Sequence, residues 1–396
     1  MAGRSQGEAM GYLENQICLW LGVKLDEPPA MPPDLARLFL RQEERESGYR
    51  NGWRVWEAPA SDNYHRGKLW VAEVDHWLSE QRARLREAGH RLEPLWPEGK
   101  PFAMYLSHDI DKVSNEQTYL QVLRATKDRA RLKRQVWFRN LKGRYPKVPE
   151  VASTMEVALD IETRHRVVSS WFFTDFPVSK AEEFDCVYLP EDPCRYKGQD
   201  TTIKAMMHDL AERGHDVGLH GSYWSAREPG MLKAQRESLE RNSGLPIRTT
   251  RQHWLHFDID ITPRLQAEAG LVVDGTLGFN RHLGFRAGTS LPFFWPDLDL
   301  LQVPLVIQDV AVFSPAAMEL DLAMANKVCS QLVGEVRQVE GCAGVLLHPE
   351  QFPLIPGLAE WYDGLIGSAL EQGGWVTSLA EINRWWRERA RRILDA

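Results

Sequence analysis

From residue 102 onward, short apolar runs alternate with longer amphipathic stretches. The apolar runs predict buried strands at 102–106, 167–174, 215–220, 247–253, 271–274, 302–308 and 344–348. The amphipathic stretches predict helices at 150–165, 201–213, 322–340 and 379–394. Alternating strands and helices favour a mostly parallel sheet or barrel with helices outside, so we predict an α/β domain over 101–396.

The first hundred residues follow a different pattern. Helical periodicity appears at 34–46 and 68–88, a Pro-rich break covers 27–33, and a polar turn region separates the two helices. No motif in 1–100 can be attached to chemistry. We expect this segment to be an N-terminal subdomain or elaboration that packs on the larger domain.

Composition and charge narrow the class of protein. With 43% hydrophobic and 26% charged residues, the 396-residue chain is typical of soluble globular proteins. A net charge of −7 argues mildly against nucleic acid as a partner. No run approaches the roughly 20 apolar residues of a membrane span, and no typical signal peptide is visible. Five cysteines without a Cys-x-x-Cys pair suggest a reducing compartment, and we expect a cytoplasmic protein without a structural zinc site.

One stretch of this acidic chain is strongly basic. A helix is predicted over 116–142, and its second half, 127–142, carries many lysines and arginines. A solvated face of an inserted helix is the simpler interpretation. The alternative is peripheral contact with an anionic polysaccharide or membrane surface.

Two carboxylates appear where the first predicted strand ends. Alternation along an extended chain sends Asp109 and Asp111 to the same side, with Ile110 turned away. Two acids in one small space are strained unless a cation neutralises one, or unless one holds a proton. A divalent metal, with one carboxylate as ligand and the other as general base, satisfies the pair. A turn whose acids cap a helix or face water is the simpler alternative.

Other predicted strands also end in residues that handle metals or protons. These residues are His220, Arg251, His253, Asp274 and His348. In a parallel barrel the carboxyl ends of the strands meet at one face, where catalytic residues gather. Any single histidine could be an ordinary core residue, but the set predicts a functional site.

Five segments resemble, in order and spacing, the motifs of the polysaccharide deacetylase family, the NodB-homology carbohydrate esterases. They are Ser-His-Asp-Ile-Asp (107–111), Gly-His-Asp-Val-Gly-Leu-His-Gly-Ser (214–222), Arg-Gln-His-Trp-Leu (251–255), Val-Asp-Gly-Thr-Leu-Gly (273–278) and Val-Leu-Leu-His-Pro (345–349). The residues of these motifs, together with Gly-Phe-Arg-Ala-Gly-Thr (284–289), are similar to those of a branch of the family often met among bacterial surface-polysaccharide genes. Residues 1–100 lie outside the resemblance.

The resemblance implies a distorted (β/α) barrel with a divalent metal, commonly zinc, with cobalt or nickel as alternatives. Carried over by position, Asp109 is the general base, Asp111 and His220 are metal ligands, and Arg251 orients the base. Because Ile110 separates two aspartates that are often adjacent in the family, the roles of Asp109 and Asp111 are open to exchange.

The implied chemistry is hydrolysis of an N-acetyl group. Water attacks the carbonyl, Asp109 takes its proton, and His348 protonates the departing amine. The resemblance assigns Asp274 the role of tuning this acid.

One ligand of the family is missing. The second motif usually supplies a histidine four residues after the first, and Trp224 stands at that position after His220. His215 is five residues away along a strand and points to the other face. His253 is the favoured replacement, with His256 as the second choice. A site with a single histidine and carboxylates is the third alternative.

Three residues are candidates for substrate binding: Ser222 in the second motif, Arg286 in a Gly-rich loop and Trp295 in Pro-Phe-Phe-Trp-Pro. Arg286 could pair with a substrate carboxylate or phosphate, or it could cap carbonyl groups as a structural arginine. Trp295 could stack on a sugar, although a core aromatic is the simpler interpretation.

Three functions therefore stand at this point. The first is a metal-dependent deacetylase acting on an N-acetylated sugar or polysaccharide intermediate. The second keeps the fold but opens a cyclic amide. The third is a degenerate, metal-free member that serves as a binding or assembly module in polysaccharide synthesis. The sequence does not predict the sugar, the linkage or the oligomeric state.

Overall fold

A curled, mostly parallel sheet forms the centre of the molecule. The computed structural model describes residues 6–113, 151–175, 185–186 and 188–394. The described sheet has ten strands, in the order β10-β11-β1-β2-β5-β6-β7-β9-β8, with β12 also pairing β1. Within this sheet, β8–β9 is the one antiparallel pair among those described. The strands are β1 (Ala103–Asp109), β2 (Ser170–Phe173), β5 (Asp216–Gly221), β6 (Thr249–Gln252), β7 (Val273–Asp274), β8 (Phe293–Phe294), β9 (Leu301–Gln302), β10 (Ile307–Gln308), β11 (Cys342–Leu347) and β12 (Trp375–Thr377).

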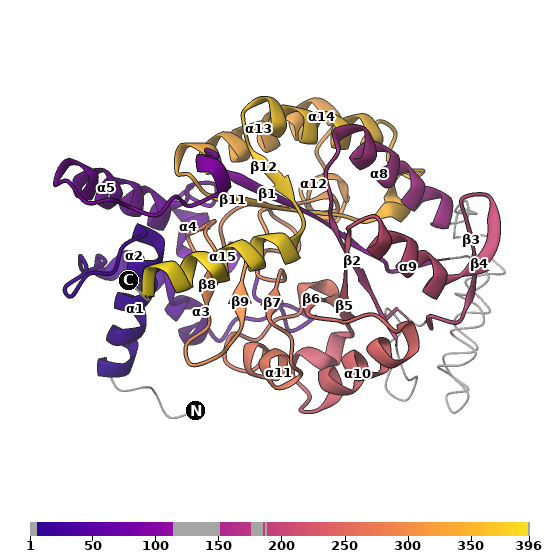
Figure 1. The fold of residues 1–396 in the computed structure, drawn as a ribbon, viewed down its shortest axis with the longest axis horizontal. Helices are drawn as coiled ribbons and strands as arrows, with labels where there is room; N and C mark the ends of the chain where they lie inside the picture. Colours follow the sequence, from indigo (N-terminus) through magenta and orange to yellow (C-terminus); the bar gives the residue numbers. More distant parts are fainter. Residues whose placement is uncertain (1–5, 114–150, 176–184, 187, 395–396) are drawn as a thin grey trace.

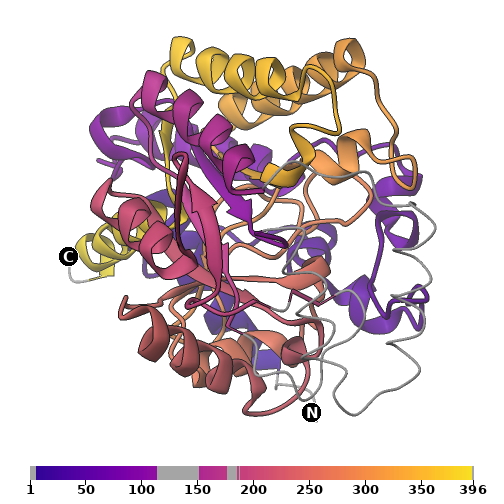
Figure 2. The same cartoon turned by 90° about the vertical axis from the view of Figure 1, so that its right-hand side faces the viewer.

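Helices surround this sheet (Figure 1). In the turned view of Figure 2, α13 and α14 again lie outside the strands. The outer helices are α8 (Val151–His165), α9 (Ile203–Glu212), α10 (Met231–Ser243), α11 (Thr262–Glu268), α12 (Asp309–Phe313), α13 (Leu322–Gln338), α14 (Leu358–Glu371) and α15 (Leu379–Leu394). The predicted fold class, a distorted (β/α) barrel, is confirmed. A separate antiparallel hairpin is formed by β3 (Pro193–Tyr196) and β4 (Gln199–Thr202).

Strand alternation separates two layers of core. On β1, Met104 and Leu106 face the layer between sheet and helices, where they join the largest hydrophobic cluster. Ala103 and Tyr105 face the other way, into a second cluster inside the barrel. Because side chains alternate along a strand, the same inward face continues to Asp109. The carboxylate at the end of β1 is therefore directed to the barrel interior.

The N-terminal region packs into the same interior cluster. It contains α1 (Gln6–Leu21), α2 (Pro33–Phe39), α3 (Gln42–Glu46), α4 (Asp62–His65) and α5 (Glu73–Glu87). Trp20 and Phe39 are buried together with Phe293 of β8 and Trp386 of α15. The predicted helix at 34–46 is two helices, because Arg41 adopts a left-handed backbone with φ 54°.

Two predictions from the sequence concern the basic stretch and membrane-spanning helices. The helix predicted over 116–142, with its basic half 127–142, lies outside the described residues. Among the helices that are described, none combines the length and hydrophobicity that crossing a bilayer requires.

Candidate metal centre and active site

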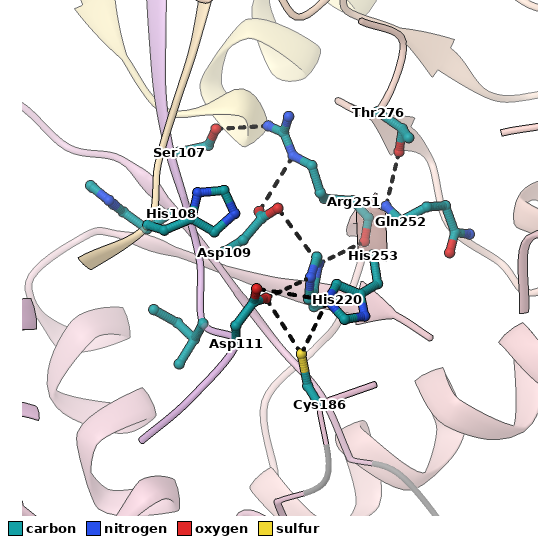
Figure 3. Close-up of polar contacts among 12 residues, drawn as sticks. Ser107, His108, Asp109, Asp111, Cys186, His220, Arg251, Gln252, His253 and Thr276 are labelled. Carbon is teal, nitrogen blue, oxygen red and sulfur yellow. Dashed lines mark hydrogen bonds and ion pairs between the residues drawn. The ribbon is translucent and has the colours of Figure 1, made fainter. Parts of the chain in front are cut away.

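The site lies at the carboxyl ends of the parallel strands β11, β1, β5 and β6, with β2 between β1 and β5. Its side chains leave β1, β5 and β6 at the point where each strand ends, as Figure 3 shows, and a fourth group follows β11. The residues that the structure places at these strand ends are Asp109, Asp111, His220, Arg251, His253 and His348. The sequence had placed the same residues at strand ends.

Four potential metal ligands converge at the centre of this face. Ligand atoms of Asp111, Cys186, His220 and His253 all lie within 4.8 Å of one another. His220 Nε2 is 3.2 Å from one Asp111 oxygen, and His253 Nε2 is 3.7 Å from the other. Donors arranged tetrahedrally around zinc lie about 3.3–3.6 Å apart, given zinc–ligand bonds of about 2.0–2.3 Å. The spacing in this cluster therefore fits a small divalent metal.

Both histidines are held with one ring nitrogen directed at the cluster. His220 Nδ1 lies 3.1 Å from the carbonyl oxygen of Arg251, which can only accept a hydrogen bond. This contact places the proton of neutral His220 on Nδ1 and leaves the Nε2 lone pair for a metal. His253 Nδ1 lies 3.4 Å from a carboxylate oxygen of Asp185, which has the same orienting effect. Histidine ligands in metal proteins are commonly oriented in this way.

The charges in the cluster stabilise one another. Burial opposes ionisation of Asp111, but the nearby His253 and His220 hold its pKa well below the usual range. Burial likewise opposes protonation of His253, but Cys186 and Asp111 raise its pKa well above the usual value. Burial raises the pKa of the Cys186 thiol. Without a cation, these groups must share protons, and a divalent metal would take the place of those protons.

Asp109 stands beside the cluster and is held by an arginine. Arg251 Nε lies 3.5 Å from Asp109 Oδ1, and Arg251 Nη2 donates a 2.7 Å hydrogen bond to Ser107 Oγ. The arginine is fully buried and Asp109 is 2% exposed. Among the described residues Asp109 Oδ1 accepts no hydrogen bond, although it is the oxygen that forms the ion pair with Arg251. The ion pair with Arg251 fixes the orientation of the carboxylate, whose other oxygen lies 3.9 Å from His220 Nδ1.

His348 is paired with a different aspartate from the one expected. Its Nδ1 lies 2.7 Å from Asp309 Oδ1, and its backbone N–H donates to Asp309 Oδ2. Burial opposes protonation of His348, but Asp309 raises its pKa well above the usual value. Asp274 instead accepts hydrogen bonds from Gln266, Thr276 and Gln302. Asp309, and not Asp274, is therefore the carboxylate that contacts His348.

Comparisons with known proteins give distant likenesses of fold. No family model and no curated protein matches the chain. A proposed polysaccharide deacetylase of Mycobacterium smegmatis matches with a TM-score of 0.49 and 18% identity, covering 76% of this chain and 96% of that one. A second, from Pseudomonas aeruginosa PAO1, has a TM-score of 0.48 and 13% identity, covering 77% and 97%. A PuuE allantoinase has a TM-score of 0.47 and 12% identity, covering 76% and 95%.

Two of these three proteins are of the type that the five motifs resemble.

The three predicted substrate-binding residues lie in packed surroundings. Arg286 is 2% exposed and forms a buried ion pair with Glu44 of α3. Trp295 is 4% exposed, and its indole N–H donates to Gln302. The Ser222 hydroxyl accepts a 2.7 Å hydrogen bond from Gln235. Arg286 thus caps a carbonyl group, that of Gly278, and Trp295 is a core aromatic, as the structural alternatives for these two residues predict.

His256, the second choice for the missing ligand, and Trp224, which occupies the usual position of that ligand, both stay outside the cluster. His256 Nδ1 lies 2.7 Å from the carbonyl oxygen of Tyr223, and its ring stacks on that tyrosine. Burial lowers the pKa of His256 to about 4. Trp224 lies beneath the guanidinium of Arg54. Of the alternatives, only His253 reaches Asp111.

An aromatic pair forms an exposed edge next to the cluster. Trp254 directly follows His253 in the short helix η4 (His253–Leu255), and its ring centroid lies 5.1 Å from that of Trp53. The two residues are 37% and 38% exposed. Trp53 comes from the N-terminal region, so that region contributes directly to the surroundings of the site.

Sequence reasoning missed four groups at the site. Cys186 and Asp185 belong to no recognisable motif, and only the fold brings them to His253. Asp309 directly follows a predicted strand, so the strand-end rule could have found it. Glu350 follows His348 closely, and burial together with the charge of Asp111 raises its pKa to about 8.

Proposed function

We propose that this protein is a metal-dependent hydrolase that removes N-acetyl groups from an N-acetylated sugar. The observation that carries the proposal is that three groups of side chains meet at one end of the barrel. They are a cluster of metal-ligating side chains, a buried carboxylate held by an arginine, and a histidine paired with an aspartate. Together they provide the functions that amide hydrolysis requires.

The residues that would hold the metal are Asp111, His220 and His253. Nitrogen and carboxylate ligands in this number suit zinc, with cobalt or nickel as alternatives. When bound, such a metal polarises a carbonyl group and makes water more acidic. The hydrogen bonds from the two Nδ1 atoms fix the ring orientations that this binding needs.

Asp109 acts as the general base. The attacking water gives its proton to Asp109 while its oxygen bonds to the acetyl carbon. Arg251 keeps the carboxylate in place through its ion pair with Oδ1. General-base catalysis of this kind contributes roughly 10²–10⁴-fold to the rate.

His348 acts as the general acid. When the bond between the acetyl carbon and the nitrogen breaks, the nitrogen takes a proton from His348 and leaves as an amine. The carboxylate of Asp309 keeps His348 protonated and holds its ring through Nδ1. Nε2 is then the atom that delivers the proton.

Two features support a carbohydrate substrate. The five motifs resemble those of polysaccharide deacetylases, and the exposed Trp53–Trp254 pair offers an aromatic face next to His253.

The five cysteines are all free thiols, which agrees with a reducing compartment such as the cytoplasm.

The test is acetate release from N-acetylglucosamine oligosaccharides by protein loaded with zinc or cobalt. We expect Asp109→Asn and His348→Gln to lower kcat by about 10²-fold or more. A matched control is His208→Gln, because His208 lies on α9 and bonds only the Ser243 carbonyl. Full activity in both site variants, or hydrolysis of a cyclic amide with no acetate release, would reject the proposal.

A further inference from the structure

Cys186 is the one member of the central cluster that the motif resemblance does not supply. Its sulfur lies 3.4 Å from Asp111 Oδ1 and 3.8 Å from His253 Nε2. The side chain is 7% exposed and faces the same point as His220 and His253 (Figure 3). Cys186 precedes β3, whereas the other three ligands lie at the carboxyl ends of strands of the parallel sheet.

These distances match coordination better than they match ordinary packing. Around a zinc ion, a sulfur at about 2.3 Å and a nitrogen or oxygen at about 2.0–2.1 Å lie roughly 3.5 Å apart. The two separations of the sulfur, 3.4 Å and 3.8 Å, bracket this value. A thiol that only donates a hydrogen bond to Asp111 would explain the first distance. It would not explain why the two histidine Nε2 atoms meet at the same place.

We infer that Cys186 is a fourth protein ligand of the metal, completing a set of one carboxylate, two imidazoles and one thiolate. This inference rests on the metal centre of the proposed function and adds a residue to it. Sulfur is a soft ligand, so the set favours zinc or cobalt over magnesium, calcium or manganese.

A fourth protein ligand changes the resting state of the site. A zinc site with four protein ligands is closed, whereas a catalytic zinc site keeps one position for water or substrate. With Cys186 in place, the resting site has no free tetrahedral position. Either the coordination number increases when substrate binds, or Cys186 moves aside. The thiol is therefore the point at which alkylation or oxidation would change metal affinity.

The test uses cobalt as a spectroscopic probe of the full-length protein, with a phosphine reductant so that no added thiol contributes. A cobalt–thiolate bond gives a charge-transfer band in the near ultraviolet. We expect this band in the wild type and its loss in Cys186→Ser. We also expect metal affinity, measured by chelator competition, to fall roughly 10-fold or more, since even outer-shell partners of ligands are worth 10–100-fold.

Cys18→Ser is the matched control. Cys18 is also buried, on α1, and its sulfur contacts the Leu25 carbonyl, a contact that a hydroxyl can keep. This variant should retain the band. X-ray absorption at the zinc edge of the wild type gives a second measurement that needs no variant, and one sulfur at about 2.3 Å is expected.

The outcomes separate this inference from the function on which it rests. One equivalent of cobalt without the band, or zinc with only nitrogen and oxygen neighbours, would overturn the role of Cys186 and leave the hydrolase intact. Retention of the band in Cys186→Ser would also overturn it. Failure to bind any metal would overturn both.

Discussion

Removing the negative charge of Glu44 should strongly destabilise the protein. Glu44 lies in α3, and its carboxylate pairs with the guanidinium of Arg286 in the Gly-rich loop. Both side chains are 1% exposed. Arg286 Nε also donates to Glu44 Oε2 over 3.2 Å, and Nη1 donates to the Gly278 carbonyl over 3.0 Å.

The expected magnitude follows from the burial of this pair. Removing one member of a buried ion pair leaves the other charge without compensation, which costs about 3–5 kcal/mol. Glu44→Ala should therefore lower the free energy of unfolding by about that amount. Replacing both members with apolar residues, as in Glu44→Leu with Arg286→Met, should restore most of the loss, because such replacements are often neutral.

Urea unfolding followed by circular dichroism measures the effect, with Glu46→Ala as the control. Glu46 lies in the same short helix and pairs with Arg37 over 2.7 Å, but its side chain is 60% exposed. Exposed pairs contribute only about 0–1 kcal/mol. Equal losses in the two single variants would refute the reasoning. So would weaker stability of the double variant than of Glu44→Ala.

Three further perturbations test the site and the fold. In Asp309→Asn the pKa of His348 should fall, because Asp309 raises it in the wild type. Since His348 acts while protonated, the alkaline limb of the pH–rate profile should move to lower pH. An unchanged alkaline limb would contradict the pairing. Zinc at 100 times its Kd should stabilise the wild type by about 2.7 kcal/mol, measured as a rise in the thermal unfolding temperature. His220→Ala should lose this rise. A rise retained in the variant would show that His220 is not a ligand. Gly344→Ala should cost about 1–3 kcal/mol, because the new Cβ would lie 2.4 Å from a carbonyl oxygen, whereas Gly334→Ala in α13 meets nothing within 4 Å and should not destabilise.

Much of the fold could be predicted because hydrophobic periodicity depends on local sequence. The runs that end at Asp109 and His220 read as buried strands, and alternation was enough to place both aspartates on one side. Boundaries were less accurate. The break at Arg41 depends on a left-handed backbone that its residue type does not indicate.

The site was predictable only where each residue ends a strand. His253 could be chosen because it ends a strand next to that of His220. Cys186 and Asp185 could not, because neither ends a predicted strand and their contacts with His253 arise from the path of the chain between β2 and β3. Arg286 shows the opposite failure, because a Gly-rich loop suggested a ligand site while its partner, Glu44, lies 242 positions away in sequence.

The position of β1 in the sheet has a consequence for how the chain folds during synthesis. β2 pairs with the second half of β1, whereas β12 pairs with its first three residues and β11 with almost its whole length. Ala103 is therefore matched with both Cys342 and Trp375. A ribosome must therefore make more than two hundred further residues before β1 gains these neighbours. Contacts so distant in sequence slow folding and leave a strand edge open in the meantime. Newly made chains should thus depend on chaperones until α15 has emerged, and variants truncated near the C-terminus should aggregate.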